Sequence, residues 1–410
     1  MAQADAGANP PANLPALPLK PSERLVSLDA YRGFIMLAMA SGGLGIAQAS
    51  KNLGGAWPGL VAQLGHVPWE GCAAWDLIQP AFMFMVGVAV PYSYARRRER
   101  GEPWGRMLRH AAARAAILAA LGVFLASAWS KQTNFIFTNV LAQIGLGYVF
   151  VFLAWGRGAR MQAAAVAAIL VGTWCIFYFY PAPEAGPGLD RAACGLPEDW
   201  PLLSGLAAHW NKNANVAARF DLWFLNLFPG EKPFAPRPGD GGYATLNFLP
   251  SIATMILGLM AGELLRSARS RRRKLLLLAV AGAALMALGL AAGWTVCPIV
   301  KRIWTPSWVL YSGAWVVWML AAFYAATDAA GLRRWALPLA VVGMNSIVMY
   351  MMAQLMKEWT WNMLGIHLGP LFAPLGLDPA YLPIVKSASV LLIFWLICVW
   401  LHRQRIFVRI

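Results

Sequence analysis

Long apolar runs separated by short polar segments dominate the 410-residue chain. A helix needs roughly 20 residues to cross a hydrocarbon core of about 30 Å, and apolar runs of about that length recur along the sequence. The first run is interrupted by Gly42, Gly43 and Gly45, and the last contains Lys386. We predict ten spanning helices, near residues 32–50, 74–94, 110–129, 138–155, 161–180, 247–265, 274–296, 308–327, 336–356 and 383–401.

The composition agrees with an all-α, polytopic transmembrane bundle in a lipid bilayer. Hydrophobic residues make up 59% of the chain and charged residues only 13%, which is too apolar for an ordinary soluble domain. The net charge of +16 does not indicate nucleic-acid binding, because the basic residues lie in short runs between apolar segments.

The distribution of positive charge predicts the topology. Most of the 34 Lys and Arg residues fall in alternate connections, including the run from Arg96 to Arg114. Because such residues accumulate on the cytoplasmic side, we predict that both termini are cytoplasmic. This topology places His66, which precedes the second predicted span, on the external side.

The chain divides into a tail and a membrane domain. Residues 1–23 are rich in Ala and Pro and lack the apolar core of a signal peptide, so we predict a disordered cytoplasmic tail. Residues 24–410 form the transmembrane domain, with a long external loop at about 181–246. The aromatic and amide side chains of this loop suit a polar ligand such as a sugar, and a lid of interfacial helices is the alternative.

The five cysteines are scattered, with no C-x-x-C pair and no metal-ligand spacing. We therefore predict neither a metal site nor an obligatory disulfide.

His66 and Asp76 flank the start of the second predicted span. An acid at a membrane boundary is costly, so Asp76 is a functional candidate, although a carboxylate in the first turn of a helix has the same pattern. Histidine can act as a base or as an acyl-accepting nucleophile near neutral pH. Pro68 disfavours a continuous helix between them, which allows the loop to bring the two side chains together.

Several other polar residues admit two interpretations. Asp29 and Arg32 could pair on a helix face, or the arginines there and at 96–114 could form a basic mouth for an anionic cofactor. Asn345 and Ser346 could join neighbouring helices or line a polar pathway. Lys301 and Arg302 form a basic pair in a predicted external loop, against the charge bias, which suggests a ligand or carboxylate partner.

Four motifs together resemble the heparan-α-glucosaminide N-acetyltransferase family of membrane acyltransferases. They are Arg24-Leu-x-Ser-Leu-Asp29-x-Tyr-Arg32-Gly33, His66-x-x-Trp69-x-Gly71-x-x-x-x-Asp76-Leu-Ile-x-Pro80-x-Phe82-x-Phe84-x-x-Gly87, Leu246-Asn-x-x-Pro-Ser-Ile-Ala-Thr254 with Leu257-Gly258-x-x-Ala-Gly262, and Gly343-Met-Asn345-Ser346.

The resemblance implies transfer of acetyl from cytosolic acetyl-CoA to a glucosamine amine across the membrane. His66 falls on the family's catalytic histidine, and Asp76 would orient its imidazole or add to its basicity. Asp29, Arg32, Asn345 and Ser346 become candidates for the acetyl-CoA end, with no metal required. The chain has only a short segment ahead of its first span, so we expect a bacterial inner-membrane protein with a cell-envelope amino-sugar or glycan acceptor.

Two other functions fit parts of the same pattern. An envelope O-acetyltransferase would use the same donor, whereas a proton-coupled transporter would use Asp76 and Lys386. The sequence leaves a homo-oligomer open, because its Gly-x-x-x-Gly spacings do not by themselves identify a face between copies.

Overall fold

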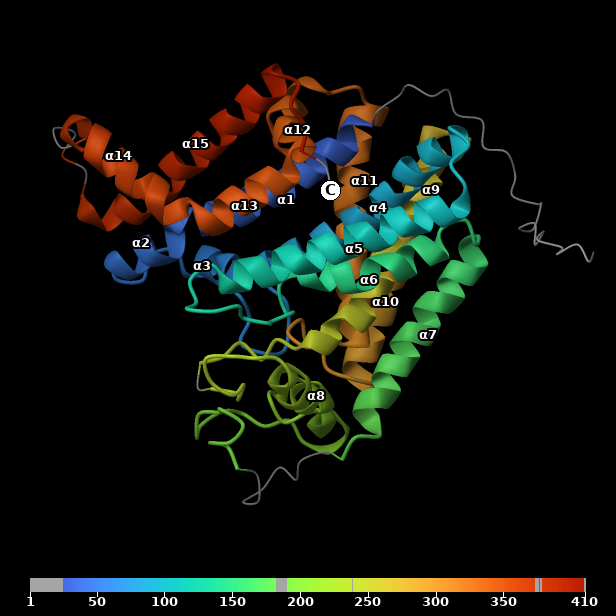
Figure 1. Ribbon diagram of the computed structural model, residues 1–410, viewed down its shortest axis with the longest axis horizontal. Helices are drawn as coiled ribbons and strands as arrows, with labels where there is room; N and C mark the ends of the chain where they lie inside the picture. The colour runs from blue at the N-terminus through green and yellow to red at the C-terminus, as the bar shows by residue number, and fades with distance from the viewer. Residues whose placement is uncertain (1–24, 182–189, 238, 373–375, 377, 409–410) are drawn as a thin grey trace, which may run out of the picture.

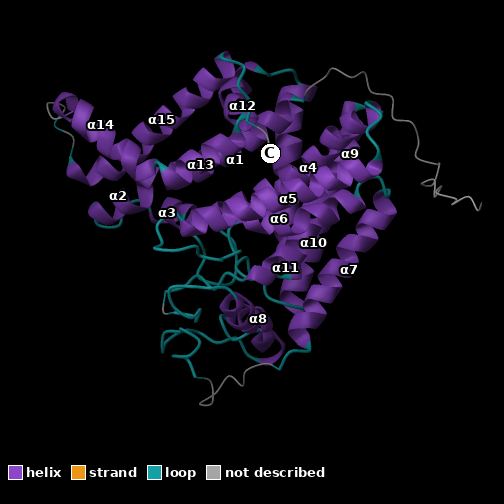
Figure 2. Cartoon of the chain, in the orientation of Figure 1, coloured by secondary structure: helices purple, strands orange, loops and turns teal. Residues whose placement is uncertain are grey.

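The computed structural model describes residues 25–181, 190–237, 239–372, 376 and 378–408, and the predicted tail at 1–23 lies outside them. Within these residues the chain forms helices and loops, with one isolated antiparallel bridge between Glu70 and Val300 (Figure 2). The all-α prediction is confirmed. The α-helices are α1 (Val26–Ser41), α2 (Ile46–Asn52), α3 (Pro58–Leu64), α4 (Ile78–Glu99), α5 (Trp104–Ser127), α6 (Val140–Ala154), α7 (Ala159–Tyr178), α8 (Val216–Phe224), α9 (Phe248–Arg266), α10 (Arg271–Thr295), α11 (Pro306–Tyr324), α12 (Leu337–Met344), α13 (Ser346–Leu355), α14 (Lys357–Phe372) and α15 (Leu382–Arg403).

Each of the ten predicted segments coincides with helix. In the described part of the chain, eight helical segments are long and apolar enough to cross a membrane, and the bent pair of α12 and α13 makes a ninth. The remaining prediction corresponds to α6, whose 15 residues are shorter than a full span. The protein is therefore a multi-pass membrane protein.

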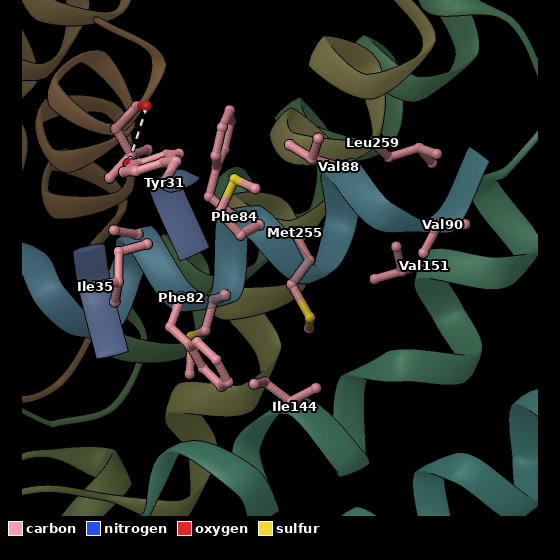
Figure 3. Packing of buried hydrophobic residues seen from close by; sticks show 14 of the residues in the cluster. Tyr31, Ile35, Phe82, Phe84, Val88, Val90, Ile144, Val151, Met255 and Leu259 are labelled. Atoms are coloured by element: carbon pink, nitrogen blue, oxygen red, sulfur yellow. Dashed lines mark hydrogen bonds between the residues drawn. The ribbon is translucent and has the colours of Figure 1, made fainter. Parts of the chain in front are cut away.

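Glycines let the central helices α4 and α9 touch at their backbones. A Cβ atom placed on Gly87 would lie 1.8 Å from the Met255 carbonyl oxygen, and one on Gly258 would lie 2.0 Å from the Phe84 oxygen. Val88, Met255 and Leu259 pack together around this contact (Figure 3). Two of the motif glycines therefore have a packing role, because only glycine fits so close an approach.

The predicted span at 336–356 is not straight. Its two halves, α12 and α13, are bent by 69° at Asn345, whose φ of −122° and ψ of 40° are not helical. The Asn345 side chain donates to the Ile406 oxygen at 3.0 Å and accepts from the Val408 nitrogen at 3.0 Å. The C-terminal segment is thus fastened at the bend.

The residues between α7 and α9 form a separate layer, here called the lid layer (190–237 and 239–244). It contains α8 and short 3-10 turns, and it lies beyond the lower ends of α7, α10 and α11 in Figure 1. A second apolar cluster joins it to the bundle, with Trp210 and Ala217 from the lid layer packed with Trp69, Phe177 and Val300. Phe177 and Trp210 are stacked with their ring centroids 6.3 Å apart.

Candidate active site

The loop from His66 to Asp76 connects α3 to the 3-10 turn Ala74–Leu77, which leads into α4. Gly71, at φ 101°, donates its N–H to the Ile299 oxygen at 2.9 Å, and Glu70 pairs with Val300. The segment before α11 therefore holds the loop in place. Two segments more than 200 residues apart in sequence thus form one structure.

The loop brings His66 and Asp76 together, as Pro68 allowed. His66 Nδ1 lies 2.7 Å from Asp76 Oδ1. Because a carboxylate can only accept, Nδ1 carries the proton and donates it to Asp76. In the neutral form of the ring the lone pair is on Nε2. The His66 side chain is 41% exposed, and the Asp76 side chain is 1% exposed. The imidazole is thus oriented by a buried acid and open to solvent.

Asp76 also accepts hydrogen bonds from backbone N–H groups of its own loop. Its Oδ2 atom accepts the N–H groups of Ala73 at 3.0 Å and Val67 at 3.3 Å. The first-turn interpretation of this acid is therefore confirmed, and its functional role stays a prediction. One oxygen fixes the loop around the first turn, and the other orients His66.

Lys301 completes the cluster from the segment before α11. Its Nζ atom lies 3.2 Å from Asp76 Oδ1 and 3.2 Å from His66 Nδ1, and only 4% of its side chain is exposed. Since Nδ1 already donates to Asp76, the ammonium group donates to the carboxylate rather than to the ring. The carboxylate partner suggested by the sequence is thus Asp76.

Arg302 connects this cluster to the lid layer. One guanidinium nitrogen donates to the Gly241 oxygen at 2.6 Å, and the other donates to the Val67 oxygen at 3.3 Å. The Tyr243 ring lies 5.8 Å from Lys301 Nζ and 5.4 Å from Arg302 Cζ. The lid layer therefore touches both the loop of His66 and the neighbours of Asp76.

Cys72 is the thiol closest in sequence to this cluster, and we expect it to be unreactive. Burial, and secondarily the charge of Asp76, raise its pKa to about 12. At pH 8 only about one thiol in 10⁴ would be ionised, against roughly a quarter for an ordinary cysteine. A variant with Cys72 as its sole cysteine should react with iodoacetamide about 10³-fold more slowly when native than in denaturing detergent. Equal rates of reaction in the native and denatured states would contradict a raised pKa of the thiol. The Cys72→Ser variant should retain the activity of the native protein.

Two cavities lie near the cluster of His66, Asp76 and Lys301 in sequence or structure. One, of about 740 Å³, is in the lid layer. The other, here called the basic cavity, has a volume of about 610 Å³ and lies beside α4. The lining of the basic cavity combines cationic residues with apolar residues such as Phe82 and Ile144. Its charged and ionisable lining comprises Asp29, Arg32, Tyr92, Arg96, Arg97, Arg100, His110 and Arg114.

The basic cavity brings together three of the four residues predicted for the cofactor end. Asp29, Arg32 and Ser346 line it. Asn345 does not line it; it is fully buried, and it holds the C-terminal segment whose Val408 forms part of the wall. Lys386 pairs with Glu358, with 2.7 Å between Nζ and Oε2.

Three further amide side chains, at the ends of predicted spans, hydrogen-bond to backbone carbonyl groups of other segments. Asn139 donates to the Gly122 oxygen at 2.9 Å, Gln143 to the Thr245 oxygen at 3.1 Å, and Asn247 to the Arg302 oxygen at 2.8 Å. The residues described by the structure contain no group of three or more His, Cys, Asp or Glu that could hold a metal ion. Their five cysteines are all unpaired.

Comparison with known proteins gives two related matches. No family model matches the chain. The heparan-alpha-glucosaminide N-acetyltransferase of Homo sapiens is 24% identical over 376 residues, covering 80% of this chain and 52% of the human protein. The Mus musculus protein of the same name is 22% identical over 379 residues, covering 82% of this chain and 54% of its own length. The chain thus spans about half the length of these relatives. It is a distant homologue of the heparan-alpha-glucosaminide N-acetyltransferases.

Proposed function

We propose that the protein is a membrane acetyltransferase that moves the acetyl group of acetyl-CoA to the amine of a glucosamine-type sugar. The observation that carries the proposal is the arrangement along α4. The cluster of His66, Asp76 and Lys301 lies at its beginning, and the basic cavity follows it from Phe82 to Arg100. The 22 residues of α4 span about 33 Å, and Phe82 is only about 9 Å along the helix from Asp76.

The basic cavity suits coenzyme A in its charge and shape. The arginines of its lining match the phosphates of the nucleotide, because guanidinium groups bind phosphate through paired hydrogen bonds. The apolar lining around Phe82 and Ile144 suits the thin pantetheine arm. Asp29, Arg32 and Ser346 are therefore proposed as cofactor-contacting residues, with Asn345 as a residue that positions the wall.

His66 supplies the chemistry through the lone pair on Nε2. As a general base it takes a proton from the acceptor amine, whose nitrogen then attacks the thioester carbonyl. The C–S bond breaks, and the thiolate of coenzyme A receives the proton from the imidazolium. In a two-step route the same nitrogen accepts the acetyl group first and passes it to the amine.

Charge distribution supports placing the basic end in the cytosol. The close contacts of Phe84 with Gly258 and of Val88 with Gly262 show that α4 and α9 run in the same direction. The Arg266 guanidinium lies 3.6 Å from the Glu99 carboxylate at that end. Two basic clusters therefore share one side, as positive residues do on the cytoplasmic side. His66 would face outward, and we propose a bacterial inner membrane with an envelope amino sugar as acceptor.

The proposal is tested with purified protein, labelled acetyl-CoA and glucosamine. The expected product is N-acetylglucosamine, with one coenzyme A thiol released for each acetyl transferred. Acetylation of glycans whose amines are blocked would instead indicate an O-acetyltransferase. Uptake of an intact solute by proteoliposomes without acetyl-CoA would indicate a transporter.

Arginines of the basic cavity should determine the affinity for acetyl-CoA. We expect the double variant Arg96→Ala/Arg100→Ala to raise KM for acetyl-CoA about tenfold, since a hydrogen bond to a charged group contributes about 1.5–3 kcal/mol and the exposed position weakens it. The KM of the native protein should rise with salt. Arg98 is on the same helix and does not line the cavity, so Arg98→Ala is the matched control. Equal effects of the two variants would contradict a phosphate site here.

A further inference from the structure

The lid layer contains a cavity of about 740 Å³ that the chemistry described above does not use. Its walls come from residues 213–244 of the lid layer and from the connection between α5 and α6. Ligand pockets of proteins have volumes of about 300–1,000 Å³. The cavity is therefore large enough for a ligand of several rings.

This cavity adjoins the candidate active site through shared walls. Gly241 and Tyr243 line it. Gly241 accepts a hydrogen bond from Arg302, which also donates to the Val67 oxygen beside His66. The Tyr243 ring lies 5.8 Å from Lys301 Nζ. A molecule in the cavity would therefore lie one side chain away from the cluster around His66.

The lining of the cavity combines aromatic rings with polar groups. Phe135 and Phe228 are stacked with their centroids 5.0 Å apart, and both line it. Asn213 adds an amide group, whereas the amide of Asn226 is bonded to the backbone of Leu222 and Phe234. Aromatic rings pack against the apolar faces of pyranose rings, and amides bond their hydroxyls. This combination suits a glycan better than an apolar ligand.

A buried acid in the wall indicates the charge of the ligand. Asp221 is only 2% exposed, and its Oδ2 atom accepts the Thr245 N–H at 2.9 Å. Its Oδ1 atom is enclosed by protein. Burial raises the pKa of Asp221 to about 6. The charged lining of the cavity comprises three acids, Asp221, Glu231 and Asp240, and two cations, Lys232 and Arg237, so the lining is net negative when Asp221 is ionised. This charge favours a hydroxyl or ammonium group of a ligand over a sulfate or carboxylate.

We infer that the lid cavity binds the part of the acceptor beyond its reacting sugar, and that this part consists of neutral or amino sugars without sulfate. The inference rests on the proposed acetyl transfer. The acceptor is then an unsulfated oligosaccharide, whose terminal amine reaches His66 while the next rings occupy the cavity. Free glucosamine would react, but without the contacts to the lid layer.

The test compares three acceptors with the purified native protein. They are glucosamine, the unsulfated disaccharide of two β-linked glucosamines, and the same disaccharide carrying 6-O-sulfate groups. We expect kcat/KM for the unsulfated disaccharide to exceed that for glucosamine at least tenfold, and the sulfate groups to remove this advantage. Equal values for glucosamine and the disaccharide, or preference for the sulfated form, would overturn the inference while leaving acetyl transfer established. Failure to acetylate any amine would instead overturn the proposed function.

Two variants locate the effect in the cavity. Asp221→Asn keeps an oxygen for Thr245 and removes one negative charge from the lining, so it should lower the ratio of kcat/KM for the unsulfated disaccharide to kcat/KM for glucosamine about tenfold. Phe228→Ala should lower the ratio independently, which keeps the test decisive if the first variant does not fold. Leu227→Ala is the control, because Leu227 is 61% exposed and does not line the cavity. An unchanged ratio in both cavity variants would overturn the inference.

Discussion

Replacing His66 by alanine is expected to lower the rate of acetyl transfer by about 10²–10⁴-fold, the usual contribution of a general acid or base. The loss should appear in kcat, because the basic cavity does not include His66 and acetyl-CoA would still bind. Steady-state kinetics and a binding measurement on the same preparation separate these effects. A variant with native kcat would exclude His66 from the reaction.

The matched control for this experiment is His367→Ala. His367 is an exposed histidine of α14, and it takes no part in the cluster, so its removal should not change the rate. Mass spectrometry of the native protein after a brief exposure to acetyl-CoA distinguishes the two chemical routes. Acetyl bound to His66 would support the two-step route, and its absence during full turnover would support direct transfer.

Replacing Lys301 by methionine is expected to cost both stability and activity. Asp76 and Lys301 are both buried, and removal of one partner from a buried ion pair typically costs about 3–5 kcal/mol because the other charge is left uncompensated. The His66 ring would also lose a defined orientation, because Asp76 could rearrange or take up a proton. Thermal unfolding in detergent and kcat measured below the melting temperature report the two effects.

An exposed ion pair provides the control for Lys301. Lys386→Met removes one partner of the pair with Glu358, whose side chain is 73% exposed. Such pairs contribute about 0–1 kcal/mol, so this variant should unfold close to the native temperature. Adding Asp76→Asn to Lys301→Met should restore part of the stability but not the activity, since the unpaired charge is gone while His66 no longer faces a carboxylate. A double variant less stable than Lys301→Met would contradict a charge-pair origin.

The apolar pattern predicted the helices well because hydrocarbon imposes one rule on every span. Each backbone group must be paired internally, so length and hydropathy suffice. The bend at Asn345 escaped this pattern, since an asparagine within an apolar run is equally compatible with a straight helix. At the bend the Asn345 side chain is bonded to residues 406 and 408, which are some 60 positions away in sequence.

The candidate site could be predicted only in part. Pro68 indicated that His66 and Asp76 could meet, because a helix between them was disfavoured. Lys301 drew attention as a cation on the sparsely charged side, but its partner is 225 residues away, and no local pattern identifies such a pair. The lid cavity was beyond prediction, since its walls come from irregular backbone whose position depends on tertiary contacts.

The glycine contacts between α4 and α9 have a consequence for how the protein works. Each backbone lies where the other would carry a Cβ atom, so neither helix can slide or rotate without a steric clash. The packed pair of helices α4 and α9 therefore holds His66 and the arginines of the basic end at a constant separation. In the proposed reaction, the thioester of acetyl-CoA and the acceptor amine must therefore meet within this fixed length. The packed core thus sets the distance between the two ends of the site.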